Sequence, residues 1–294
     1  MTEFGYLLPT FEDGDMVELA VRAELAGFDS VWVPDGPVVY GLPDPLMVLA
    51  ALASATKRVR LATGVLLGAL RQPVLLAHTL ATLDRLSGGR LIVGLGYGFG
   101  TPENARQFAA AGVPFETRVA RLVETVEVLR ALWTGKPVSH MGRYFSFAEL
   151  TLSPAPVKPP PIWLAGAGAA AERRAGRLAD GWLPYHPSPE LYADGWRRVR
   201  DEGRDVTAGL YATVALDSSV DVARQRLRTT VERWYGRPFE AVSALQAMYA
   251  GTPDGLRDWL APYLDAGVRY VVLRAADGDP RRGLDSLGQV ISAL

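Results

Sequence analysis

The sequence predicts an α/β protein, a (β/α)8 TIM barrel with an insertion between its fourth and fifth strands. Two observations support this: short apolar segments alternate about eight times with helical segments, and no linker-like, low-complexity segment interrupts residues 1–294. The whole chain is therefore interpreted as a single domain. A doubly wound open sheet uses the same repeating units and is the main alternative, but eight units favour a closed barrel.

The first two strand and helix pairs precede the basic pair at residues 57–58. A short apolar segment at Phe4–Leu8 is followed by a helical segment at Asp15–Ala26, which Gly27 ends. The second strand is predicted at Ser30–Val33, and a proline-rich loop leads from it to an apolar helix at Leu46–Ala55.

The stretch from residue 59 to residue 100 contains the clearest strand, helix and strand pattern in the chain. Val59–Gly64 is long enough for one strand and too short for a helix. A helix begins at Pro73, because the fixed φ of proline suits the first helical position, and ends at Ser87 before two glycines. Leu91–Leu95 is almost wholly apolar, as in a strand that is covered on both faces.

The rest of the chain continues the alternation after one interruption. Residues 135–161, with a hairpin-like SHMGRYFSF and a proline-rich LSPAPVKPPP, are predicted to form the insertion outside the sheet. The remaining predicted strands are Ile162–Ala165, Gly181–Leu183, Thr207–Ala215 and Tyr270–Leu273. The remaining predicted helices are Pro102–Ala110, Glu116–Trp133, Ala169–Leu178, Pro189–Glu202, two helices within Val220–Tyr249 split near Gly236 and Pro238, Thr252–Ala266 and a final helix.

Composition excludes several classes of function. With 31 basic and 32 acidic residues the formal net charge is -1, so no global field favours nucleic acid or an anionic membrane. No apolar segment reaches membrane-spanning length and no leader-like segment is recognised, which indicates a cytoplasmic protein. The absence of cysteine excludes thiol and iron–sulfur chemistry. His78, His140 and His186 lack metal-ligand spacing, so no metal site is expected.

The predicted strand ends favour a flat ring ligand over an ion. In a (β/α)8 barrel the reactive groups follow the carboxyl end of each strand, and here most of these residues are apolar, aromatic or glycine. After the fourth strand, Gly94, Gly96, Gly98 and Gly100 alternate with larger residues, so one face of an extended chain would lack side chains. A planar ligand could lie there; close packing inside the barrel is the alternative. The strand ends in question include Leu8-Pro9-Thr10-Phe11, Pro34-Asp35-Gly36, Gly64-Val65-Leu66, Gly96-Tyr97-Gly98-Phe99 and Leu183-Pro184-Tyr185-His186.

A glycine turn after the fifth strand is a candidate phosphate site. Gly166, Ala167 and Gly168 lead directly into a helix, whose first N–H groups and positive dipole end together bind phosphate. GAGAAA also fits the dinucleotide pattern G-x-G-x-x-G/A, which leaves a Rossmann-type NAD(P) dehydrogenase as an alternative. The acidic residue that such a site needs at the end of the next strand is not evident. A tight turn that binds no ligand is a further alternative.

Two polar side chains at strand ends are candidates for catalysis. Asp35 could bond a cofactor hydroxyl or amide, or cap its own loop. His186 is the histidine best placed to donate a proton, with Tyr185 beside it. Arg71 and Arg274 could meet an anion, although surface arginines are common.

Several separated motifs make the chain resemble the luciferase-like monooxygenase superfamily, and in particular its coenzyme F420 (deazaflavin)-dependent branch. The motifs are LATGVLLGALRQPVLLAHTLATLDRLSGGRLIVGLGYGFG, GVPFETRVARLVETVEVLRALWTG, LSPAPVKPPPIWLAGAG, ERRAGRLADGWLP and GTPDGLRDWLAPYLDAGVRYVVL. The resemblance implies a barrel that binds a flavin or deazaflavin and transfers a hydride to or from a small organic substrate. It also implies a non-prolyl cis peptide at Gly64-Val65 beneath the ring, and a cofactor phosphate at Gly166, Ala167 and Gly168.

The sequence departs from the family at two places. Many relatives have Asp-His where this chain has Asp35-Gly36, and some place a glutamate where it has Phe99. No general acid or base is therefore transferred from the family. The expected function is an F420-dependent oxidoreductase, a homodimer as relatives often are, with Gly64, Val65, Gly96, Tyr97 and Gly98 near the ring. The alternatives are an FMN-dependent monooxygenase supplied by a separate reductase, and a non-catalytic flavin-binding relative.

Overall fold

The computed structural model describes residues 2–9, 15–36 and 41–293, in two compact units. Unit 1 comprises residues 1–32 and 164–294, and unit 2 comprises residues 33–163. The predicted strand end at Thr10-Phe11 lies outside the described residues. Among the residues described, no helix is both long and apolar enough to cross a lipid bilayer.

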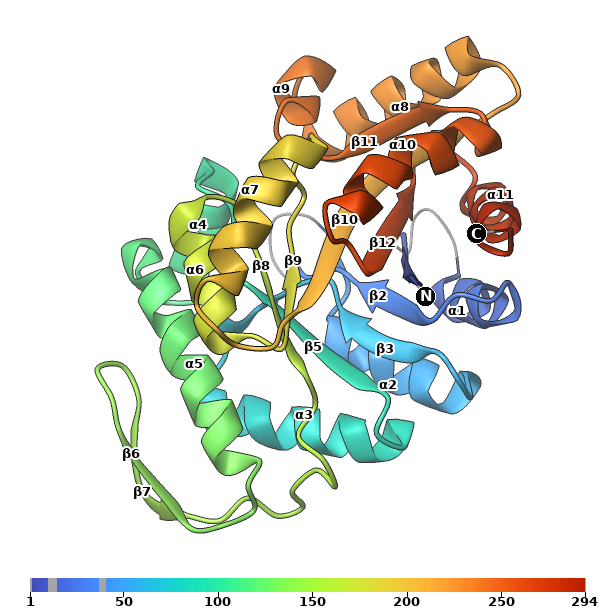
Figure 1. Cartoon of the computed structure of the whole chain (residues 1–294). Coiled ribbons are helices and arrows are strands. Elements are labelled where there is room, and N and C mark those ends of the chain that lie inside the picture. Colours follow the sequence, from blue (N-terminus) through green and yellow to red (C-terminus); the bar gives the residue numbers. More distant parts are fainter. Residues whose placement is uncertain (1, 10–14, 37–40, 294) are drawn as a thin grey trace. The chain divides into compact units, whose positions relative to one another are not determined.

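Unit 1 alternates strands and helices (Figure 1), and most bounds agree with those predicted from the sequence. Its strands are β1 (Glu3–Leu7), β2 (Ser30–Val33, which ends one residue inside unit 2), β9 (Gly181–Leu183), β10 (Thr207–Leu216), β11 (Met248–Gly251) and β12 (Tyr270–Ala275). Its helices are α1 (Met16–Leu25), α6 (Ala169–Leu178), α7 (Pro189–Arg200), α8 (Val220–Tyr235), α9 (Phe239–Ser243), α10 (Pro253–Asp265) and α11 (Pro280–Ile291).

Unit 2 contains the clearest predicted segment and the insertion. Its strands are β3 (Arg60–Thr63), β4 (Leu66–Leu67), β5 (Leu91–Gly96), β6 (Val138–Met141) and β7 (Ser146–Leu150), and β8 (Ile162–Ala165) begins in it. Its α-helices are α2 (Pro45–Ala55), α3 (Pro73–Ser87), α4 (Pro102–Ala110) and α5 (Arg118–Leu132), with 3-10 turns η1 (Gly68–Leu70) and η2 (Phe115–Thr117).

The helices begin and end where the sequence has capping residues. Asp15 and Asp44 accept hydrogen bonds from the first-turn amides of α1 and α2. Gly88 ends α3 at φ 70°, in the left-handed region that glycine adopts without a steric cost. These local signals explain why most predicted helix bounds agree with the structure to within two residues.

The parallel pairing in unit 1 runs β2–β1–β12–β10. β10 is long enough to pair with two further strands: Thr207 and Ala208 pair with β9, and Thr213–Leu216 pair with β11. The sequence prediction of helix through Tyr249 is therefore wrong at its end. Residues 248–251 form a strand because their backbone pairs with the second half of β10, a tertiary contact that helical periodicity does not reveal.

In unit 2, β5 pairs with two consecutive strands. Leu91 and Ile92 pair with β3, whereas Leu95 and Gly96 pair with β4. The chain between β3 and β4 is the segment Gly64-Val65, which lies beside the glycine-rich end of β5. The short strand β4 and the turn η1 were not predicted, because the sequence between Gly64 and Pro73 reads as a loop.

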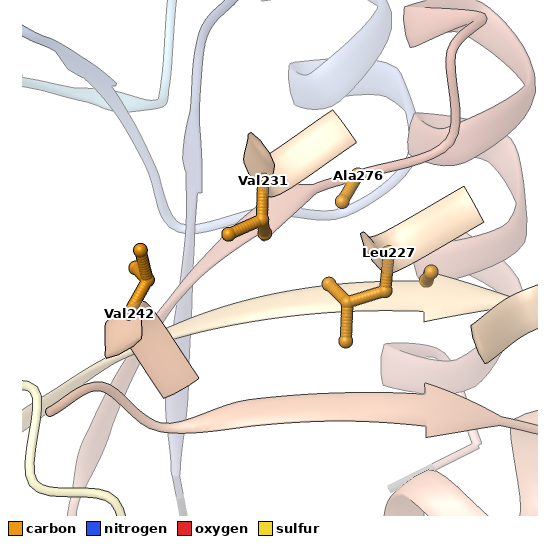
Figure 2. Close-up of a cluster of buried hydrophobic side chains, with 5 residues drawn as sticks. Leu227, Val231, Val242 and Ala276 are labelled. Carbon is orange, nitrogen blue, oxygen red and sulfur yellow. The ribbon is translucent and has the colours of Figure 1, made fainter. Parts of the chain in front are cut away.

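An apolar cluster fixes α8 and α9 to the sheet of unit 1. Leu227 and Val231 of α8, Val242 of α9, Ala215 of β10 and Ala276 after β12 are all nearly inaccessible to solvent. Figure 2 shows these side chains gathered between the two helices and the strands. Burial of such side chains contributes about 1.5–3 kcal/mol for each Val or Leu.

A buried glutamate anchors the insertion to α5. The hairpin of β6 and β7 projects from the end of α5 (Figure 1). Glu124 on α5, with its side chain 8% exposed, accepts hydrogen bonds from the amides of Phe145 (2.8 Å) and Tyr144 (3.0 Å) and lies 3.2 Å from His140 Nε2. Burial alone would raise the pKa of Glu124, but these hydrogen bonds outweigh it and hold the pKa below its ordinary value.

We expect E124A to lower the free energy of unfolding by about 2 kcal/mol, because two part-buried amides lose a charged acceptor. The control is E127A, which removes an exposed carboxylate from the same helix. Because the folded state lowers the pKa of Glu124, its contribution is present above the unfolded pKa of about 4.3 and is lost as the pH falls below it. Urea titrations from pH 7 to pH 3 should show the gap between wild type and E124A closing; a gap independent of pH would contradict the assignment.

Candidate functional site

Asp35 lies directly after β2, as the sequence predicts, and its carboxylate is buried in unit 2. The side chain is 1% exposed; Oδ2 accepts a hydrogen bond from the Leu67 amide at 2.9 Å, and Arg71 Nη2 lies 3.3 Å from Oδ1. Burial raises the pKa of Asp35, and the Arg71 guanidinium opposes that rise. The carboxylate thus ties the end of β2 to the segment of β4 and η1.

A cavity of about 260 Å³ lies beside Asp35 within unit 2. Arg71 bridges two carboxylates there, since its Nη1 lies 2.9 Å from Asp44 Oδ2 while Nη2 faces Asp35. The other lining residues are Leu70, Gln107, Ala110 and Ala111. A concave site with a few converging polar groups and a buried carboxylate of altered pKa is typical of a ligand pocket.

The segment between β3 and β4 has the backbone that the resemblance implies. The Gly64-Val65 peptide bond is cis. A Cβ atom added to Gly96 would lie 2.6 Å from Val65 Cγ2, so glycine is required there by the close approach of the Val65 side chain. The Val65 side chain therefore fills the space beside Gly96 on this face of β5.

The other glycines after β5 have different causes. Gly98 has φ 75°, which favours glycine, whereas a Cβ added to Gly100 would meet no atom within 4 Å. Tyr97, between Gly96 and Gly98, is half-buried, and Phe99, between Gly98 and Gly100, is 49% exposed. The alternating glycines therefore have three different causes: Gly96 is required by close packing and Gly98 by its backbone conformation, whereas Gly100 lies beside open space.

In unit 1 the turn between β8 and α6 is held at both ends. Gly166 and Gly168 have φ values of 139° and 93°. The carbonyl of Gly166 accepts a hydrogen bond from Trp182 Nε1 at 3.0 Å, and the amide of Gly168 donates one to Glu172 Oε1 at 2.9 Å. The amide of Gly168 is therefore engaged within the protein.

Other amides of this turn fit a phosphate. In the part of the chain that the structure describes, no acceptor pairs with the amides of Ala167, Ala169 or Ala170 at the start of α6. A Cβ added to Gly168 would meet no atom within 4 Å, so space is open beside them. Three unpaired donors at the positive end of a helix suit an anion with several oxygens.

His186 is buried against Glu172. It is 8% exposed, its Nε2 lies 3.1 Å from Glu172 Oε1, and its carbonyl accepts a hydrogen bond from Tyr263 at 3.0 Å. Burial lowers the pKa of His186, although Glu172 partly opposes this. The neutral imidazole therefore donates Nε2–H to Glu172, and this contact favours a positioning role over proton transfer to a substrate.

The predicted site residues divide between the two units. Unit 2 holds Asp35, Gly64, Val65, Gly96, Tyr97 and Gly98, and unit 1 holds Gly166, Ala167, Gly168 and His186. Within unit 2 the structure brings Val65 onto Gly96, and within unit 1 Glu172 links Gly168 to His186.

The sequence analysis did not predict a role for Glu172 or for Arg198, its third hydrogen-bond partner after Gly168 and His186. Arg198 on α7 donates to Glu172 Oε2 at 2.6 Å. An acidic residue in the first turn of a helix was the available signal, since it complements the helix dipole.

Curated proteins that resemble this chain match it along nearly its whole length. An F420-dependent glucose-6-phosphate dehydrogenase of Amycolatopsis mediterranei is 29% identical over 98% of this chain and 97% of its own length. Another protein of that name, from Nocardia farcinica, is 30% identical over 94% of this chain and 92% of its own.

Solved structures show the fold. An F420-dependent secondary alcohol dehydrogenase bound to an F420–acetone adduct has a TM-score of 0.85 at 24% identity, over 99% of this chain and 98% of its own. A monooxygenase from Streptomyces bottropensis has a TM-score of 0.81 at 25% identity, over 99% of both chains. The protein is therefore a (β/α)8 barrel, as predicted, and the doubly wound sheet is excluded.

The family follows from the sequence itself. The profile of the luciferase-like monooxygenases matches residues 2–270. The chain belongs to the luciferase-like monooxygenase family, which confirms the resemblance drawn from its motifs.

We expect G96A to displace Val65 and lower the thermal midpoint by several degrees, because the added methyl overlaps the half-buried Val65 side chain. V65A/G96A should recover part of the loss, since it removes Cγ2. The control is G100A, which adds the same methyl where space is open. Thermal unfolding of the four proteins tests this; equal midpoints for G96A and G100A would contradict the close contact.

Proposed function

We propose that this protein is a coenzyme F420-dependent oxidoreductase that transfers a hydride between the deazaflavin and a small organic substrate. The observation that carries the proposal is the match of 94–98% of the chain to relatives named for F420-dependent dehydrogenation. The amides of Ala167, Ala169 and Ala170, which pair with no acceptor among the described residues, support it, because they suit the phosphate of such a cofactor.

We assign each unit a separate contribution. In unit 2, Gly64, Val65, Gly96, Tyr97 and Gly98 support the ring. In unit 1, the turn at Gly166–Gly168 holds the phosphate, with the amide of Ala167 donating and that of Gly168 engaged by Glu172. The bound deazaflavin supplies the hydride chemistry; the protein binds it, orients it and keeps water away.

Asp35 is the candidate for contact with the reacting molecules. Its buried carboxylate opens onto the cavity with Arg71, and this pair suits a hydroxyl, carbonyl or amide group of the substrate or cofactor. With Gly36 in place of the family's histidine, no imidazole follows Asp35 in the chain. We assign His186 a positioning role, through its hydrogen bond to Glu172, and not direct proton transfer to a substrate.

The second candidate function is an FMN-dependent monooxygenase supplied by a separate reductase. The likeness to the Streptomyces bottropensis monooxygenase favours it. The two functions differ in the ring that is bound, in the need for oxygen and in the need for a reductase.

We expect apoprotein to bind F420 and to reduce or oxidise it with members of a panel of alcohols, ketones and sugar phosphates. Fluorescence titration with F420 and with FMN, followed by anaerobic absorbance assays, measures both. Tight FMN binding with no F420 binding would reject the first function in favour of the second. F420 binding without turnover across the panel would indicate the non-catalytic relative.

We also propose that the protein is a homodimer that associates through α2 and α3 of unit 2. Helix α2 has no charged residue, and Met47 on its outer face is 64% exposed. On α3, Leu75 and Leu86 are 69% and 64% exposed and share a face, since they are eleven residues apart. Met47, Leu75 and Leu86 are thus exposed apolar side chains on two packed helices, and such side chains suit an isologous contact.

We expect M47D/L75D to convert a dimer into a monomer, because it places two carboxylates in an apolar contact. Light scattering after size exclusion measures the mass. The control is L25D, which changes a leucine on α1 that is 79% exposed. A wild-type monomer, or a dimer that persists in M47D/L75D, would contradict the proposed interface.

A further inference from the structure

Glu172 is a buried carboxylate with three donors, all in unit 1. Its side chain is 1% exposed and accepts from Gly168 N, His186 Nε2 and Arg198 Nη1, at 2.9, 3.1 and 2.6 Å. A buried carboxylate is stable only when its lone pairs are satisfied in this way. It also lies in the first turn of α6, beside the amides proposed for the cofactor phosphate.

The position of Glu172 is fixed by the close approach of α7. A Cβ added to Gly195 on α7 would lie 2.9 Å from His186 Nε2, 3.0 Å from Glu172 Oε1 and 2.8 Å from the Trp182 ring. No larger residue fits there, so α7 lies directly on the histidine and glutamate pair. Glu172 consequently has little freedom to turn away from Gly168.

Arg198 neutralises the carboxylate. Burial lowers the pKa of His186 and keeps its imidazole neutral, so the positive charge that pairs with the Glu172 carboxylate is the guanidinium of Arg198, whose side chain is 38% exposed. Without that charge, a buried anion would lie one hydrogen bond away from Gly168, beside a turn that has to attract a second anion. The ion pair of Glu172 and Arg198 therefore affects anion binding at this turn as well as the packing of α6 on α7.

We propose that Glu172 and Arg198 are positioning residues for the phosphodiester of the cofactor. Glu172 holds the amide of Gly168 inward, so that the amides of Ala167, Ala169 and Ala170 remain for the phosphate. Arg198 cancels the charge of Glu172, so that the phosphate is not repelled. This inference rests on the proposed function, because the phosphodiester belongs to F420.

The test compares F420 with the ribityl deazaflavin that lacks the phosphodiester (the phosphate-free deazaflavin), using wild type, R198M, E172Q and E172Q/R198M. R198M keeps the apolar stem of Arg198 and exposes the charge of Glu172. R198M should weaken F420 binding about tenfold and leave binding of the phosphate-free deazaflavin unchanged, because only F420 carries the phosphodiester. E172Q keeps an oxygen for Gly168 N and removes the charge, so adding R198M to it should change F420 affinity less than about twofold.

R197M is the matched control. Arg197 is the neighbouring residue, its side chain is 68% exposed, and it pairs with Asp194 on the same helix. R197M should bind both ligands as wild type does, and circular dichroism at 25 °C should show that every variant is folded.

Three results with the variants would overturn the inference: unchanged F420 binding by R198M, an equal loss for the phosphate-free deazaflavin, or the same tenfold loss in the E172Q background. The last result would mean that Arg198 contacts the phosphate itself. Wild type that binds the phosphate-free deazaflavin and F420 equally would also overturn the inference. Wild type that binds neither ligand would reject the proposed function, and the inference with it.

Discussion

Burial of the strands on both faces is the constraint on which the rest of this structure depends. Apart from β11 and the β6–β7 hairpin, the strands of both units are largely inaccessible to solvent, so most of their side chains are apolar and their backbone groups are paired. Charged groups can then lie only where strands end, and each needs a partner there. Asp35 after β2 takes the Leu67 amide and Arg71; Glu172 after β8 takes Gly168, His186 and Arg198.

Much of the fold could be predicted because its signals are local. Caps such as Asp44 and the left-handed Gly88 set helix bounds, and continuous apolar segments mark the strands. The errors occur where a contact with a residue distant in sequence determines the secondary structure. Met248–Gly251 is a strand because it pairs with the second half of β10, and β4 exists because the end of β5 continues beyond β3. Neither pairing leaves a periodic pattern in the sequence.

The site was predictable to a smaller extent. The cis bond at Gly64-Val65 came from a family resemblance and is present; no composition or spacing indicates it. Glu172 was missed because its partners His186 and Arg198 lie 14 and 26 residues away, so only the packing of α6 on α7 brings them together. In a sequence, a glutamate within an arginine-rich helix is indistinguishable from one on a solvated face.

The attachment of the hairpin has an evolutionary consequence. Glu124 holds it chiefly through the backbone amides of Tyr144 and Phe145, which any residue other than proline supplies. Side chains on β6 and β7 other than His140 can therefore change during evolution while the backbone contacts to Glu124 persist. The insertion is thus a region where new surfaces can be tried during divergence, or grafted by design, without disturbing the barrel beneath.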